Sequence, residues 1–219
     1  HKFLFVGWDA ADWKVINPMM EQGLLPNIEQ FIADGVIGNL ATLDPPYSPM
    51  LWTSIATGKR PYKHGVHGFH EPWDKGSGIR PVMSTTRTCK AIWNILTQEG
   101  YKTHVLGWWP SHPAEPVNGV AISDFFAKPA GRLYEDWPVS EGSIHPPEME
   151  DYFAWLRLHP EELTTNILAL FVPNWAKADK KQQKRMAAIA RETAMATTLH
   201  NCYTNILRTQ EWDFAAIYL

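Results

Sequence analysis

The sequence predicts an α/β domain in which helices flank a mostly parallel sheet. Residues 3–8 form a continuous apolar run of strand length, as expected for a strand covered on both faces. Segments with helical spacing alternate with further apolar runs along residues 3–125, which is typical of strand–helix–strand units. A chain of 219 residues with 45% hydrophobic side chains is long enough to bury the core of such a domain.

The first part of the chain alternates expected strands and helices. Asp12 precedes the first helical stretch as its N-cap, and Gly23 follows that stretch. A loop rich in proline, residues 45–49, leads into a further helix that Gly58 ends. We expect strands at residues 3–8 and 36–42, and helices at residues 13–22, 28–34 and 50–57.

The second part of the chain adds strands and then a long helical segment. We expect an irregular loop at residues 70–88, a helix at 90–100, strands at 102–108 and 119–123, a loop at 129–147, helices at 148–158, 161–171 and 179–209, and a strand at 213–219. Residues 1–128 are then the N-terminal part of the α/β core, residues 129–210 a loop and helical cap insertion, and residues 211–219 a returning core strand. Because a domain seldom ends in a core strand, we expect this chain to be the N-terminal portion of a longer one.

The composition excludes several classes of protein. A formal net charge of −3 and a pI near 6.3 argue against binding to nucleic-acid polymers. The mean hydropathy is −0.28, and no apolar run reaches the roughly 20 residues of a membrane span. Cys89 and Cys202 are too few for a disulfide scaffold or a four-cysteine zinc site. No secretory leader precedes residue 3, which favours a cytoplasmic protein over an exported one with its leader removed and leaves both open.

Asp9 directly follows the first expected strand. In open parallel sheets, ligands bind outside the carboxyl ends of the strands, so a carboxylate there is placed to bind a metal ion or a substrate. The alternative role is an N-cap for residues 13–22, for which Asp12 is better placed because it directly precedes that stretch. Both interpretations of Asp9 are open.

Ser48 begins the helix that Gly58 ends. Ser48-Pro49 is typical of an N-cap followed by a proline in the first turn, so the hydroxyl lies at the positive end of the helix, which stabilises anions. Ser48 is therefore either a cap or a nucleophile, and a serine nucleophile needs an activator. No Gly-x-Ser-x-Gly motif surrounds it, which disfavours a Ser-His-Asp hydrolase. A metal ion is another activator, and Asp9 is a candidate ligand for it.

Three histidines, His64, His67 and His70, are spaced by three residues. On a helix this spacing would place them on one side, where they could bind a metal ion. Gly65 and Gly68 disfavour a helix here, so a structural role in a loop is the alternative.

Several of these features occur together in a known pattern. The pattern has a strand ending in aspartate, a proline-led loop carrying a serine or threonine, a helix ending in Thr-Gly, and a Pro-x-x-His-Gly turn. Here these are Asp9, the loop 45–49 with Ser48, Thr57-Gly58, and Pro61 with His64-Gly65; residues 107–120 and Ser123-Asp124 also match. The sequence resembles the type I phosphodiesterase/nucleotide pyrophosphatase family of the alkaline phosphatase superfamily, clearly over residues 3–125 and again at the final strand. The resemblance implies an alkaline-phosphatase-like fold and a metal-dependent hydrolase of small phosphate esters.

The resemblance also implies roles for individual residues. Asp9 is a ligand of the first metal ion, and Ser48 is the metal-bound nucleophile that takes the phosphoryl group covalently. Two divalent ions are implied, zinc first and manganese as the alternative. The remaining aspartate and histidine ligands of the family would follow Leu219.

Two positions depart from the family pattern. Ala10 stands where glycine is common, and Leu51 stands where some nucleotide-cleaving members carry asparagine, which weakens the expectation of nucleotide specificity. A sulfatase ranks lower because Ser48 is not followed by the x-Pro-x-Arg pattern. The alternatives are a phosphomutase or phosphonate hydrolase of the same superfamily, or a catalytically inactive α/β binding module.

Overall fold

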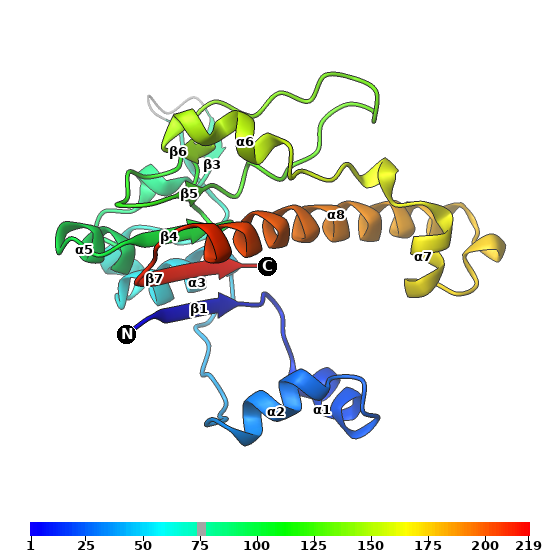
Figure 1. Ribbon diagram of the computed structural model, residues 1–219. Coiled ribbons are helices and arrows are strands. Elements are labelled where there is room, and N and C mark those ends of the chain that lie inside the picture. The colour runs from blue at the N-terminus through cyan, green and yellow to red at the C-terminus, as the bar shows by residue number, and fades with distance from the viewer. Residues whose placement is uncertain (74–77) are drawn as a thin grey trace.

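A five-stranded sheet forms the centre of the protein in a computed structural model, which describes residues 1–73 and 78–219 (Figure 1). Its strand order is β1-β7-β4-β5-β6. The strands are β1 (Phe3–Gly7), β7 (Phe214–Tyr218), β4 (Thr103–Leu106), β5 (Ala121–Ile122) and β6 (Ile144–His145). All neighbouring strands pair in parallel except β6, which is antiparallel to β5. The predicted α/β class with a mostly parallel sheet is confirmed.

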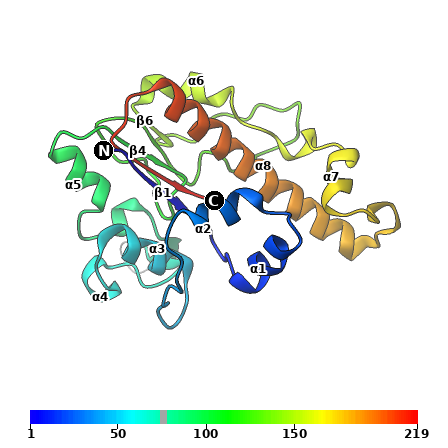
Figure 2. The ribbon, with the colours of Figure 1, turned by 60° about the horizontal axis from the view of Figure 1, so that its bottom comes forward.

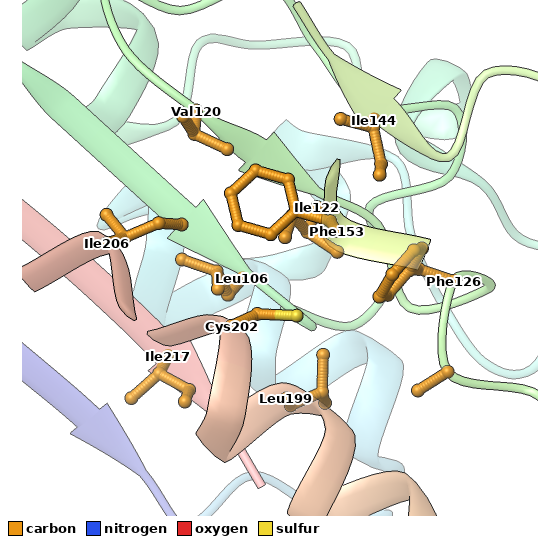
Figure 3. Packing of buried hydrophobic residues seen from close by; sticks show 11 residues of the cluster. Leu106, Val120, Ile122, Phe126, Ile144, Phe153, Leu199, Cys202, Ile206 and Ile217 are labelled. Carbon is orange, nitrogen blue, oxygen red and sulfur yellow. The ribbon is translucent and has the colours of Figure 1, made fainter. Parts of the chain in front are cut away.

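Helices cover both faces of the central strands. On one face, α3 (Ser48–Thr57) and α5 (Ile92–Gln98) bury Ala56 and Trp93 against Phe214 and Ala216 of β7. On the other face, the C-terminal part of α8 (Lys180–Thr209) packs against β4, β5 and β7. Figure 3 shows the cluster on that face: Leu106, Ile122 and Ile217 of the strands with Leu199, Cys202 and Ile206 of the helix.

The helices α1 (Trp13–Glu21) and α2 (Pro26–Ala33) lie apart from the sheet, beside the free edge of β1 (Figures 1 and 2). Neither helix contains a buried residue. The side chain of Asp12 accepts a hydrogen bond from the N–H of Lys14 at 2.9 Å, which confirms its predicted role as the N-cap of α1.

The prediction of a strand at residues 36–42 is wrong. This segment is irregular, and Val36 and Leu40 are almost fully exposed. A strand needs a partner for its backbone N–H and C=O groups. In the described part of the chain, the only strand paired with β1 is β7, so residues 36–42 join no sheet edge. Their apolar character alone does not make them a strand.

The predicted loop at residues 70–88 is more regular than expected. It contains the antiparallel strands β2 (His70–Pro72) and β3 (Ile79–Pro81), while residues 74–77 of the predicted loop lie outside the described residues. The short strand β6 also falls within a predicted loop.

The remaining helices are α4 (Pro61–His64), α6 (Glu150–Ala154) and α7 (Thr165–Phe171). None of the helices in the described part of the chain is both long and apolar enough to span a membrane. The division of the chain at residues 128 and 210 stays a prediction.

Candidate active site

Asp9 and Ser48, 39 residues apart in the sequence, are in contact at the carboxyl edge of the sheet. The hydroxyl of Ser48 donates to Asp9, with 3.3 Å between Oγ and Oδ1. The N–H of Asp9 donates to the carbonyl of Leu219 at 2.9 Å, which continues the pairing of β1 with β7 beyond Gly7. The structure therefore brings together the two residues that the sequence singled out.

Neither residue has the capping role that was its structural alternative. Asp12 caps α1, so Asp9 is not needed there. Ser48 is the first residue inside α3, and Tyr47 occupies the N-cap position without a side-chain capping bond. The interpretation of Ser48 as an N-cap is wrong, because its hydroxyl is directed to Asp9 instead of to the helix backbone.

Tyr218, at the end of β7, is a third member of the site that sequence analysis missed. Its hydroxyl donates to Oδ2 of Asp9 at 2.7 Å, and its ring packs edge-on against Trp52 of α3 at 4.9 Å between centroids. Burial, together with the bond to Asp9, raises the pKa of Tyr218, so the phenol stays protonated and acts as a donor. Because β1 and β7 are parallel, their carboxyl ends meet at one edge. The sequence shows both strand ends, but it does not show that they are neighbours.

Gly7 allows α3 to approach the end of β1 closely. A Cβ atom at this position would lie 2.5 Å from the Trp52 ring, which is closer than carbon atoms can approach without displacement. The carbonyl of Trp52 accepts a bond from Nε1 of Trp108 at 3.2 Å, and the two rings meet edge-on at 5.4 Å. These contacts fix α3 on the sheet and hence fix the position of Ser48 relative to Asp9.

The turn after Asp9 is strained. Ala10 has a φ of 56°, in the left-handed region that favours glycine. This is the position at which the sequence departs from a glycine that is common in the family it resembles. The strain costs roughly 1–2 kcal/mol, which the surrounding packing must offset.

His64 has a structural role. Its ring is fully buried, Nδ1 accepts a bond from the N–H of Val66 at 3.1 Å, and Nε2 lies 2.9 Å from Oγ of Ser54. Burial lowers the pKa of His64 to about 4, so the imidazole is neutral near pH 7 and links α3 to the turn after α4. With both ring nitrogens engaged, His64 is not placed to bind a metal ion, and His67 and His70 are exposed.

The oxygen atoms of Asp9 and Ser48 are spaced as two ligands of one divalent cation would be. Both donors are oxygens, and two oxygens bound to one tetrahedral ion at about 2.1 Å lie about 3.4 Å apart. The distance between Oγ and Oδ1 is 3.3 Å. Among residues 1–73 and 78–219, no group of three or more His, Cys, Asp or Glu side chains is arranged to hold an ion. Asp9 and Ser48 therefore fit as two ligands of a larger set.

A cavity of about 500 Å³ borders Asp9 on the side of α8. Its walls come from the carboxyl edge of the sheet, the loops after β4 and β5, and one stretch of α8. The lining includes Asp9, Trp109, Asp124, Lys128, Glu192, Met195, Ala196, Leu199 and Tyr218. Most of the lining surface is apolar. A cavity at the carboxyl edge of a parallel sheet is the usual position of a ligand site.

Comparison with known proteins identifies a family. The sequence model of the family described as type I phosphodiesterase / nucleotide pyrophosphatase matches residues 3–219. No curated protein sequence and no solved structure matches the chain. The match covers the strands, α3 and the cavity described above.

Proposed function

The chain belongs to the type I phosphodiesterase/nucleotide pyrophosphatase family, and from this premise we propose that Ser48 is the nucleophile of a metal-dependent phosphoester hydrolase. The family consists of phosphoester hydrolases of the phosphodiesterase and pyrophosphatase type and is generally metal-dependent. We propose in addition that Asp9 and Ser48 are ligands of one of two divalent cations, zinc first and manganese second. The substrate is a small phosphate ester.

The contact between Ser48 and Asp9 carries the proposal. It joins the end of β1 to the start of α3 over 3.3 Å, and neither side chain has a capping role that would explain it. A divalent cation bound there would lower the pKa of the hydroxyl and offset negative charge on the phosphate. Tyr218 holds Oδ2 of Asp9, so Oδ1 is the carboxylate oxygen that faces Ser48.

The N-terminus of α3 stabilises the negative charge on the phosphate group in the proposed reaction. α3 has ten residues, with Pro49 in its first turn, and the side chain of its N-cap residue makes no capping bond. The backbone N–H groups and the dipole at this end therefore stabilise a phosphate oxygen next to Ser48.

The proposed reaction has two displacements. Oγ of Ser48 passes its proton to solvent and forms a bond to phosphorus, while the bond from phosphorus to the leaving oxygen breaks and that oxygen keeps the electron pair and takes a proton from solvent. Water then attacks the phosphoserine, the bond to Oγ breaks, and Ser48 regains its proton. Asp9 orients the hydroxyl in the first step, because Oδ1 is the acceptor of its hydrogen bond.

The test compares Ser48→Ala and Asp9→Asn with Asp12→Asn in the full protein, using bis(p-nitrophenyl) phosphate. We expect the first two variants to lose at least about a thousandfold in kcat/KM, because each removes a group at the reacting centre. Asp12→Asn should retain activity, since asparagine also caps a helix. Mass spectrometry after acid quenching should find phosphate on the peptide that contains Ser48.

Two outcomes would contradict the proposal. The first is a Ser48→Ala variant that hydrolyses the ester as fast as the parent protein. The second is undiminished hydrolysis after removal of divalent ions with a chelator. Phosphonates and sugar phosphates in the same assay distinguish a phosphonate hydrolase or a phosphomutase from a phosphodiesterase.

A further inference from the structure

We propose that the cavity beside α8 binds the leaving group of the ester, and that this leaving group is apolar and aromatic. The inference rests on the proposed function and adds the substrate class to it. The apolar part of the lining comes from Trp109, Ala127, Met195, Ala196 and Leu199. Three of these residues lie on α8, in the segment that joins β6 to β7.

The polar groups of the cavity already have partners within the protein. Asp9 accepts from Tyr218, and Glu192 pairs with Arg191 at 2.9 Å. Oδ1 of Asp124 accepts from two backbone N–H groups, and its Oδ2 lies 3.6 Å from Nζ of Lys128. A polar ligand would compete with these interactions, whereas an apolar group gains free energy by leaving water. The lining therefore selects for an apolar occupant.

Asp9 connects the cavity to the nucleophile. Its side chain contacts Ser48 and also borders the cavity, while Ser48 is not among the described residues of the lining. In-line displacement requires the leaving group on the side of phosphorus opposite the attacking oxygen. A phosphate held at Asp9 with Ser48 on one side therefore directs its leaving group away from α3, and the cavity lies toward α8.

The size of the cavity and its aromatic and aliphatic lining suit a ring system. Its volume of about 500 Å³ is within the range of small-molecule sites, about 300–1,000 Å³. Ala196 contributes only a methyl group to the lining, and Trp109 contributes a partly exposed ring. Aromatic rings pack well against such a surface. Gly107 brings the sheet edge close to α8, because a Cβ there would lie 2.6 Å from Cδ1 of Leu199.

The test fills the cavity from its exposed side. Ala196→Trp places a large ring in the cavity, and Ala187→Trp is the matched control on the same helix, exposed and outside the cavity. The substrates are methyl phenyl phosphate and methyl 2-naphthyl phosphate, which share the transferred group and differ in the size of the leaving group. We expect the parent protein and Ala187→Trp to prefer the naphthyl ester by about tenfold in kcat/KM. Ala196→Trp should lose this preference, because kcat/KM for the naphthyl ester should fall more than kcat/KM for the phenyl ester.

A binding measurement separates this inference from the proposed function. Calorimetry compares 2-naphthylmethylphosphonate, which is not hydrolysed, with methylphosphonate on all three proteins. Tighter binding of the naphthyl probe that Ala196→Trp abolishes supports the cavity assignment even if no Ser48-dependent hydrolysis is found, a result that would overturn the proposed function alone. If Ala196→Trp leaves both the substrate preference and the binding unchanged, the cavity assignment is wrong, and Ser48-dependent hydrolysis in the same samples would leave the proposed function standing. Thermal melts verify that both variants are folded.

Discussion

Strands β1 and β7 are both apolar, have five residues each and pair in parallel, yet they differ greatly in burial. Val6 of β1 and Ile217 of β7 are partners in register, but Val6 is 46% exposed and Ile217 only 1%. β7 has a strand on each side and a helix layer on each face, whereas β1 is an edge strand beside two helices with no buried residue. The position of a strand in the sheet, more than its composition, decides how much it contributes to stability.

The two residues of the candidate active site also differ in how well their surroundings are packed. Ser48 lies on α3, which Trp52 fixes to the sheet through its contacts with Trp108 and Tyr218. Asp9 lies on the less packed β1 side. Its backbone N–H donates to the carbonyl of Leu219, and its carboxylate accepts a hydrogen bond from Tyr218 of β7. Ser48 thus has a packed support, and the carboxylate of Asp9 depends on a few hydrogen bonds. Regions with few buried contacts open at lower free energy than the core.

The largest expected effect compares the two strands directly. Ile217→Ala should lower the free energy of unfolding by about 3–4 kcal/mol, because it removes buried methyl and methylene groups and leaves a cavity. Val6→Ala, at the partner position, should cost about 1 kcal/mol or less, since its side chain is already half in water. Urea denaturation of both variants measures the difference. Equal losses would show that β1 is as well packed as β7 and would contradict the claim that the two strands contribute differently to stability.

The second prediction concerns the packed side and its dependence on pH. His64 has a pKa of about 4 in the folded protein and 6.5 when unfolded, so protonation favours the unfolded state. The stability that neutral His64 provides is complete above about pH 6.5 and is lost as the pH falls toward 4, by up to about 3 kcal/mol. Between pH 7 and 5 the parent protein should therefore lose about 2 kcal/mol more than His64→Gln.

Denaturant titrations at several pH values measure this difference. His67→Gln is the matched control, because His67 is exposed and lies three residues further along the chain. Parallel pH profiles for the parent protein and His64→Gln would contradict the assignment of His64 as a buried neutral residue.

The third prediction tests the junction between the two regions. Gly7→Ala should destabilise the protein by about 1–3 kcal/mol, because the new methyl group displaces the Trp52 ring and with it α3. The displacement should separate Ser48 from Asp9 and lower kcat/KM, whereas Gly38→Ala, where an added Cβ meets no atom within 4 Å, should change neither. A Gly7→Ala protein with full activity would show that the close approach of α3 is not needed for the site.

Local patterns were sufficient to predict several elements. The continuous apolar runs at residues 3–8 and 213–219 predicted β1 and β7, and Asp12 and Gly58 marked helix ends that the structure contains. The two site residues, Asp9 and Ser48, also came from the sequence, through their positions at a strand end and a helix start. Capping and turn preferences act over a few residues, so the sequence displays them directly.

Only the tertiary structure decided which elements are neighbours. It placed β7 between β1 and β4, which brought Tyr218 to Asp9, and it left residues 36–42 without the strand partner that their apolar character had suggested. It also directed the hydroxyl of Ser48 to Asp9 instead of to its own helix, and it set α8 beside the sheet edge to enclose the cavity. Local propensity depends on adjacent residues, so it can be predicted from the sequence. Strand order and burial depend on contacts between residues far apart in the sequence, and these contacts form only when the whole core is packed.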